Sequence, residues 1–371
     1  MTAPLDKSEA TSRQLLFSAA AFIQSSSLLS SFVMVLTGRE SWISALLGLC
    51  ISLLLVWAYT ALVKRYPGKN LFGILAAVFG EPLGRLFSFF YVFFFLSMVA
   101  VGANDVSGFV VDYIMPQTPQ VVIVLTFLFV CGWAARKGAG GICRMGFLFF
   151  LLAVAVTLVN ILLLAKDMQL SNFLPVFQLP LGRYLQGGFV VASVPLGEVL
   201  VFLMFAPNLE AGGGFRRSMF IGLALGAATL LTVILRNVAV LGNLASVASL
   251  PSYEAVRHIK LAEVITRVDL LYALTMLFLQ FFKTAIYFYA AALGLAQVFR
   301  LRDYKYLLPA MGALAAAYAF ILFGPSMENI YGGSRVLPVF AAVFEGVLPL
   351  FTLLAAFLRR GGRMRRKEAL A

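Results

Sequence analysis

Apolar runs long enough to cross a membrane alternate with short polar segments along nearly the whole chain. A helix needs about 20 mostly apolar residues to cross the hydrocarbon core of a bilayer. By this measure the sequence predicts ten transmembrane helices, at residues 13–34, 41–63, 84–111, 119–135, 143–165, 185–206, 218–242, 268–298, 306–324 and 336–358. The predicted fold class is therefore an all-α integral membrane protein. One transmembrane domain, 13–358, lies between a cytoplasmic N-terminal segment, 1–12, and a basic cytoplasmic tail, 359–371.

One segment between the spans also has an apolar pattern. Residues 251–263 are too polar to cross a bilayer, but they contain the apolar residues Val256, Ile259 and Leu261. The pattern predicts a short helix that lies at the membrane interface.

Composition agrees with this class, and charge gives an orientation. The chain is 61% hydrophobic and 12% charged, whereas soluble domains are about 25% charged. If the N-terminus is cytoplasmic, 20 Lys and Arg residues fall in cytoplasmic segments and seven in external ones. This bias predicts that both termini are cytoplasmic. It also accounts for the net charge of +13 without a nucleic-acid partner. We expect the basic tail to contact anionic membrane lipid, and docking to a partner protein is the alternative.

Two of the spans contain residues that interrupt a helix. Ten spans divide into five plus five, and many transporters consist of two inverted five-helix repeats whose first helices are broken near the membrane midplane. The sixth span has Pro195 and Gly197 directly before Glu198. The first span has a polar stretch near its middle, where serine hydroxyls can loosen a helix by bonding to the backbone. This stretch consists of Gln24, Ser25, Ser26 and Ser27. The pattern predicts breaks in spans 1 and 6.

An ordered set of short motifs extends along nearly the whole chain. It comprises SRQL at 12–15, WIS at 42–44, KRYPGKNLF at 64–72, MPQTP at 115–119, RKG at 136–138, NFLPV at 172–176, GEV at 197–199 followed by FLMF, FxK at 281–283 and RDY at 302–304. With this order and spacing, the chain resembles the B subunits of spore germination receptors. These are endospore germination permeases of the amino acid–polyamine–organocation (APC) superfamily.

The resemblance implies a fold, a role and partners. It implies the LeuT/APC-type 5+5 inverted repeat, with broken helices 1 and 6. It also implies that the protein senses a small germinant, such as an amino acid, in the spore inner membrane beside A-type and lipoprotein C-type subunits. The chain departs from the family pattern at 23–26, Ile-Gln-Ser-Ser, because the family has a glycine at this break and serine lacks its backbone freedom.

Glu198 and Lys283 are the principal candidates for chemistry. A carboxylate within the hydrocarbon costs about 2.5–3.5 kcal/mol, so Glu198 needs compensation. It would bind an ammonium group, a cation or a proton at the break in span 6, or pin the broken helix to a neighbouring helix. Lys283 lies mid-span in span 8 and is the natural counter-charge. It would replace a coupling cation or belong to a fixed ion pair.

The other candidates surround these two. Gln280, Lys283, Thr284 and Tyr287 lie on one helix face, which we expect to face the bundle interior. Asp105 in span 3 would complete the site or be a solvated residue nearer the outer end. The residues of the span 1 break would offer backbone groups to a zwitterion, or would pack closely against a neighbouring helix. Glu345 in span 10 would be a relay residue or a partner for Lys283.

Three functions are compatible with these residues. The first is a transporter-like germinant-receptor subunit that binds its ligand between spans 1, 3, 6 and 8 and signals to partner subunits. The second is a proton-coupled secondary amino acid transporter, and the third is a structural scaffold of the receptor complex. The only histidine is His258, and no P-loop pattern is present. The sequence therefore predicts neither an enzyme nor a metal or cofactor site.

Overall fold

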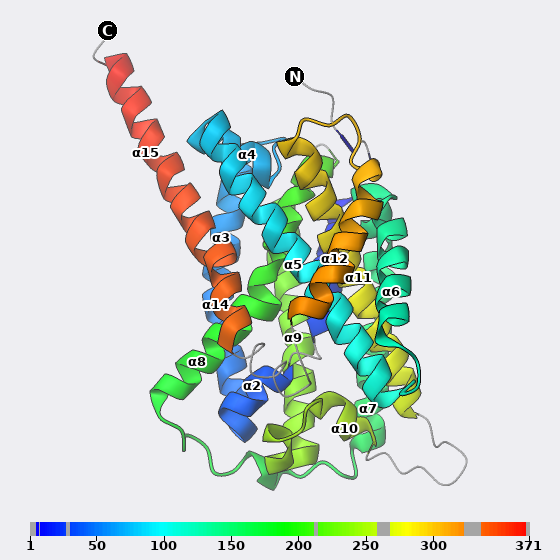
Figure 1. Cartoon of the computed structure of the whole chain (residues 1–371). Helices are drawn as coiled ribbons and strands as arrows, with labels where there is room; N and C mark the ends of the chain where they lie inside the picture. Colours follow the sequence, from blue (N-terminus) through cyan, green and yellow to red (C-terminus); the bar gives the residue numbers. More distant parts are fainter. Residues whose placement is uncertain are drawn as a thin grey trace.

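The computed structural model describes residues 5–6, 8–26, 30–210, 214–257, 268–322 and 335–368. Almost all of them lie in helices that form an elongated bundle (Figure 1). The helices are α1 (Ser12–Ser25), α2 (Ser30–Thr37), α3 (Ser41–Arg65), α4 (Leu71–Phe79), α5 (Glu81–Tyr113), α6 (Gln120–Ala135), α7 (Gly138–Leu164), α8 (Leu181–Val191), α9 (Phe215–Leu241), α10 (Pro251–Arg257), α11 (Val268–Val298), α12 (Leu308–Leu322), α14 (Leu337–Ala342) and α15 (Leu348–Glu368). Among the described residues, the only strand-like pairing is one bridge between Ala10 and Leu209.

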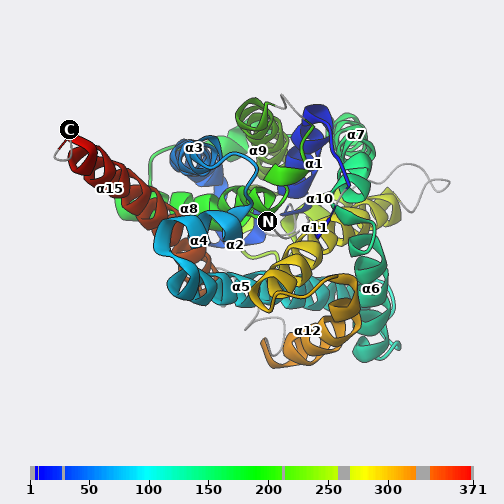
Figure 2. The ribbon, with the colours of Figure 1, turned by 90° about the horizontal axis from the view of Figure 1, so that it is seen from above.

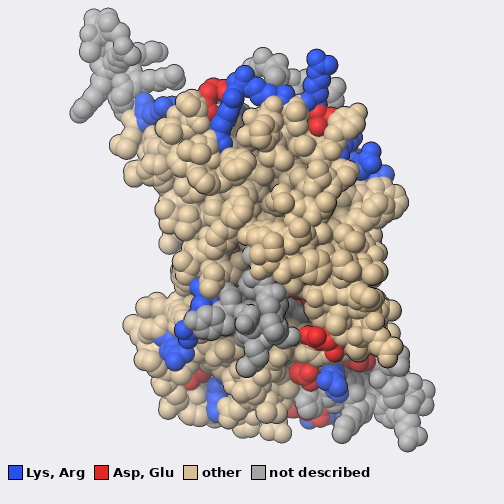
Figure 3. All heavy atoms as spheres, viewed as in Figure 1, with Lys and Arg blue, Asp and Glu red and all other residues tan. Residues whose placement is uncertain are grey.

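The surface of the bundle has the charge distribution of a membrane protein. On the face shown in Figure 3, charged side chains gather at the two ends and leave an uncharged band between them. Many large apolar side chains are exposed on the described surface, for example Phe129 at 74% and Leu162 at 75%. The segment that leads into the bundle from the N-terminus and the C-terminal end of α15 both lie at the top of the bundle (Figure 1). An even number of crossings requires this arrangement.

Seven apolar helical runs in the described part are long enough to cross a membrane. They are Ser31–Arg65, Glu81–Tyr113, Gly138–Leu164, Leu181–Met204, Phe215–Ser246, Asp269–Val298 and Leu337–Arg359. The first run joins α2 and α3 across Gly38, whose φ of +53° separates the two helices. The three remaining predicted spans are shorter, because α1 has 14 residues, α6 has 16 and α12 has 15. Ten crossings therefore remain a prediction.

Both predicted helix breaks are confirmed. In span 1, α1 ends at Ser25 and α2 begins at Ser30, while Ser27 lies outside the described residues. In span 6, α8 gives way to a π-helical turn, Ala192–Leu196, that contains Pro195. A 3₁₀ segment, Gly197–Met204, follows it. Since proline has no N–H group to donate, the regular helical bonding pattern cannot continue through this turn.

The bundle is organised around α11 and α1. α11 packs mainly against α5, and α1 packs between α7 and α9. In Figure 2 the bundle is seen from above, with α6 and α12 together at one edge and α15 projecting from the opposite side. The two helix breaks thus lie within the bundle, where other helices surround them.

Two elements differ from the sequence-based expectations. The short helix α4 was not predicted. Asn70 caps its N-terminal end, where the side chain accepts a hydrogen bond from Gly73 N at 2.9 Å, and Gly80 with φ +86° caps its C-terminal end. A short helix is present at the start of the predicted segment as α10, and its place at the membrane interface stays a prediction. Val256 is 1% exposed and packs in a cluster with Tyr253 and Phe109. It therefore contacts protein instead of lipid. Ile259, Leu261 and His258 lie outside the described residues.

We expect Gly84→Ala to destabilise the fold. A Cβ atom at Gly84 would lie 2.6 Å from Ala76 Cα and 2.8 Å from Ala76 N, so α4 and α5 would have to separate. Overpacking of this kind costs about 1–3 kcal/mol, which thermal unfolding in detergent would detect. Gly108→Ala is the matched control on α5, because nothing lies within 4 Å of its Cβ position. If the two variants melted at the same temperature, the close packing of α4 on α5 would be refuted.

Candidate functional site

A buried ion pair joins the two broken spans to α11. Lys283 Nζ on α11 pairs with the Glu198 carboxylate, and the two side chains are only 7% and 2% exposed. The same Nζ donates a hydrogen bond to Ser26 Oγ at 2.9 Å. Glu198 directly follows the π-helical turn of span 6, and Ser26 caps the C-terminal end of α1. One ammonium group therefore contacts both helix breaks.

Aromatic side chains enclose the ion pair on the α1 side. Lys283 Nζ lies 5.4 Å from the centre of the Phe22 ring, within the range of a cation–π interaction. The Tyr287 ring packs against Phe22 at 5.4 Å and against Phe95 at 6.0 Å. These rings exclude water from the lysine, which strengthens its attraction to Glu198.

Two small cavities flank the ion pair, each of about 10 Å³. The first is lined by residues of α5, α11, α14 and span 6, including Gly102, Asp105, Glu198, Lys283, Thr284 and Tyr287. The second lies beside Ser26 and Pro195, among apolar residues of α2, α8 and α9. A cavity of this size holds about one water molecule. The structure therefore shows a closed form of the site.

The polar face predicted for span 8 lies along the first cavity. Gln280, Lys283, Thr284 and Tyr287 all contribute to its wall. Thr284 Oγ1 and Tyr287 Oη have no hydrogen-bond partner in the described part of the chain, and neither has Gln24 Oε1 in α1. Buried polar atoms almost always have a partner. These atoms are consequently available to a molecule that enters the site.

The structure also places the other residues that the sequence predicted for the site. Asp105 was expected to complete the site or to be solvated in an outer vestibule, and the structure places it on the cavity wall with Lys283. Pro195, Gly197 and Ser26 lie at the breaks themselves. Ser25 donates its hydroxyl to Phe22 O within its own helix, so its side chain is already used.

The sequence did not indicate that Glu345 lies against the break in span 6. It is 0% exposed and lies in a second π-helical turn, Val343–Val347. A Cβ atom at Gly197 would be 2.5 Å from Glu345 Oε2, so the carboxyl group lies directly against the break in span 6. Tyr59 Oη donates to the backbone carbonyl of Glu345 and lies 3.4 Å from that of Gly197. The partner of Lys283 is Glu198, and Glu345 instead abuts the broken backbone.

The N-terminal segment closes the bundle at one end. Asp6 Oδ2 accepts hydrogen bonds from Ala139 N at 2.8 Å and from Tyr289 Oη at 2.7 Å. Ser8 Oγ accepts one from Gly140 N at 2.9 Å. These bonds satisfy free N–H groups at the start of α7 and fasten the segment across α7 and α11.

Comparisons with known proteins identify relatives in sequence. The sequence profile of a family described as "Spore germination protein" matches residues 11–327. Spore germination protein KB of Bacillus subtilis (strain 168) is 26% identical, and the alignment covers 98% of each chain. Spore germination protein B2 of the same organism is 24% identical, with 94% of this chain and 96% of the relative covered.

Solved structures with the same fold are membrane transporters. Mhp1, a nucleobase-cation-symport-1 family transporter in a closed conformation with bromovinylhydantoin bound, aligns with a TM-score of 0.62 and 14% identity. That alignment covers 94% of this chain and 80% of the transporter. MhsT in complex with L-phenylalanine aligns with a TM-score of 0.52 and 13% identity, over 95% and 96% of the two chains. The predicted LeuT-type fold is thereby confirmed.

We expect Lys283→Met to destabilise the protein more than removal of the whole ion pair does. The single change leaves Glu198 buried without its counter-charge, which costs about 3–5 kcal/mol in such pairs. Lys283→Met combined with Glu198→Gln removes both charges and should recover most of the loss. Thermal unfolding of both single variants and the double variant measures the coupling. Additive effects would show that the two side chains do not interact.

Proposed function

Because the chain belongs to the spore germination protein family, we propose that it is the transporter-like membrane subunit of a spore germinant receptor. In this proposal it lies in the spore inner membrane with both termini in the cytoplasm. It binds a small germinant between spans 1, 3, 6 and 8, and A-type and lipoprotein C-type subunits respond to the bound state. The fold and the family support the proposal, and the ion pair of Lys283 with Glu198 is the single observation on which the site rests.

The chemistry of this pair favours a zwitterion such as an amino acid. A ligand carboxylate would accept hydrogen bonds from Lys283 Nζ and Ser26 Oγ, which already lie 2.9 Å apart. A ligand ammonium group would donate to Glu198. Each buried charge would then exchange one counter-charge for another, so neither is left unpaired. MhsT was solved with an amino acid, L-phenylalanine, which shows that this fold can hold such a ligand.

Ligand entry requires a change of shape. The cavity beside Glu198 is only about 10 Å³, so an amino acid fits only if α5, α11 and the broken spans move apart. A ligand can shift a conformational equilibrium only by as much as it prefers one state. Here the preference arises because the ligand replaces contacts that hold the closed form together. Partner subunits would respond to the resulting movement of α11 and span 6.

A proton-coupled secondary transporter is the second candidate, and one observation favours it. The solved neighbour Mhp1 is a cation-symport transporter, and the same buried carboxylate and lysine would serve coupling. The two functions differ in whether solute accumulates across the membrane. Concentrative uptake of a ligand into vesicles that contain only this chain would favour the transporter.

We expect a thermal-shift screen of amino acids against the purified chain to give a ligand whose binding depends on Glu198 and Thr284. Glu198→Gln removes the negative charge that would pair with an ammonium group and replaces one carboxylate oxygen with an NH₂ donor. Since a hydrogen bond to a charged group is worth about 1.5–3 kcal/mol, affinity should fall about ten-fold or more. Thr284→Val should weaken binding by less. Glu210→Gln, which alters an exposed carboxylate, is the control. Unchanged affinity in Glu198→Gln would refute this site.

A further inference from the structure

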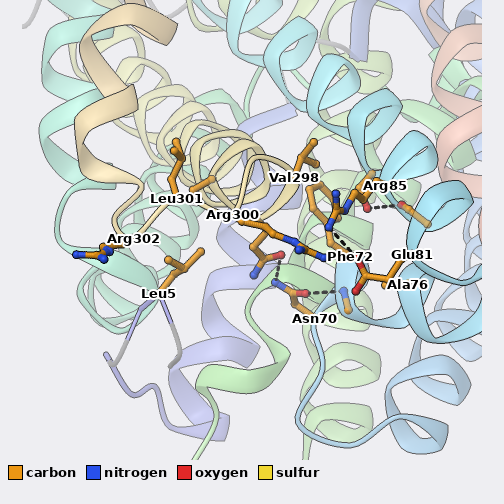
Figure 4. A pocket seen from close by; sticks show the side chains of 15 residues that line it. Leu5, Asn70, Phe72, Ala76, Glu81, Arg85, Val298, Arg300, Leu301 and Arg302 are labelled. Carbon is orange, nitrogen blue, oxygen red and sulfur yellow. Dashed lines mark hydrogen bonds and ion pairs between the residues drawn. The ribbon is translucent and has the colours of Figure 1, made fainter. Parts of the chain in front are cut away.

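Another cavity, much larger than the two beside the ion pair, lies away from that site. It has a volume of about 750 Å³, within the usual range of ligand sites, and it opens at the end of the bundle where Leu5 lies. Its walls come from α4, the start of α5, the end of α11 and the loop that follows α11 (Figure 4). The proposed germinant site uses none of the residues that line it.

The walls of this cavity are held in place by the packing of the chain. Asn70 Nδ2 donates to Gln297 Oε1 at 3.0 Å and so joins the start of α4 to α11. Phe72 packs so closely on α11 that a Cβ atom at Gly294 would lie 2.2 Å from its ring. The cavity is therefore a preformed feature, and a ligand would not have to order its walls.

Three arginines line the cavity, and two of them meet at one carboxylate. Glu81 Oε2 accepts hydrogen bonds from Arg85 Nη2 at 2.9 Å and from Arg300 Nη2 at 2.8 Å (Figure 4). Arg302 lines the same cavity. One carboxylate offsets one of three guanidinium groups, which leaves a net charge of +2. Two guanidinium groups thus already point at one position that suits an anionic oxygen.

The bonds made by Glu81 are easily exchanged for others. The side chains of Glu81 and Arg300 are each 67% exposed, and that of Arg85 is 42% exposed. Ion pairs so open to water contribute little to stability. Guanidinium groups bind phosphate oxygens through paired hydrogen bonds, as they bind carboxylates. A phosphate group would therefore take the position of the Glu81 oxygen between Arg85 and Arg300.

We propose that this cavity binds the phosphate of an anionic phospholipid. The surroundings favour a lipid over a soluble anion. Leu83 and Leu86, in the first turns of α5, are 51% and 49% exposed, and Phe299 beside Arg300 is 62% exposed. These exposed side chains belong to residues next to Arg85 and Arg300 in the chain or within one turn of them, and they offer apolar surface for acyl chains near the cavity. Basic pockets between helices at the cytoplasmic side of a membrane are suited to anionic headgroups, and the charge bias predicts that side here.

The test measures lipid binding to the purified full chain. Phosphatidylglycerol is titrated into the protein in a neutral detergent, with phosphatidylcholine and inorganic phosphate in parallel, and the melting temperature is followed. We expect a saturable rise with phosphatidylglycerol only. Arg300→Gln and Arg302→Gln should each weaken it about five-fold. Glu81→Gln should strengthen it, because the internal competitor for the arginines is lost.

Two matched variants at the same end of the bundle serve as controls. Arg217→Gln and Glu210→Gln change the net charge by the same amounts on exposed residues outside the cavity. They should leave the titration unchanged. If they shifted it as much as the cavity variants, the effect would be general surface charge and the proposal would fail. Inorganic phosphate that bound as tightly as the lipid would overturn the lipid assignment. So would an acidic peptide that bound through Arg300 while the lipid did not.

Discussion

The burial of one ammonium group constrains the architecture of this protein. Lys283 lies in the middle of a long apolar helix and is almost inaccessible to solvent. Its charge is tolerable there only with a counter-charge and hydrogen-bond acceptors at close range. Glu198 and Ser26 provide them. Both residues lie at the breaks of spans 1 and 6. Irregular backbone within a membrane occurs only where protein or a water-filled cavity surrounds it, and the packing around Lys283 provides such surroundings. The ion pair and the two breaks therefore depend on one another.

A second carboxyl group is built into the same region. Glu345 is fully buried, and neither of its carboxyl oxygens has a partner among the described residues. A single ammonium balances a single carboxylate, and Lys283 is paired with Glu198. The place of Glu345 against Gly197 is possible only because glycine has no side chain. The start of the 3₁₀ segment in span 6 thus meets the π-helical turn of span 10, and Tyr59 Oη lies within hydrogen-bond distance of a backbone carbonyl of each.

The sequence predicted the fold well because the signals were local. Pro195, Gly197 and Glu198 are exceptional in an apolar run, and Lys283 with Thr284 and Tyr287 repeats at helical spacing. The helix α4 was missed because nine residues are too few to cross a membrane, although Asn70 and Gly80 mark its two ends. The contact of Glu345 with Gly197 joins residues far apart in the sequence. So does the convergence of Arg85 and Arg300 on Glu81. Such contacts depend on how helices pack, which the periodicity of one helix does not specify.

The closed site and the open arginine cavity place different demands on a ligand. At the ion pair, a ligand must replace a counter-charge for Lys283 and for Glu198 at the same time. An anion alone would leave Glu198 unpaired, and a cation alone would leave Lys283 unpaired, each at the high cost of a buried charge. Selectivity for a zwitterion then follows from the cost of the alternatives, as in other sites that reject a wrong ligand. At the arginine cavity the charges are exposed and water screens them, so an anion binds without such a requirement. The two sites are therefore suited to different ligand classes.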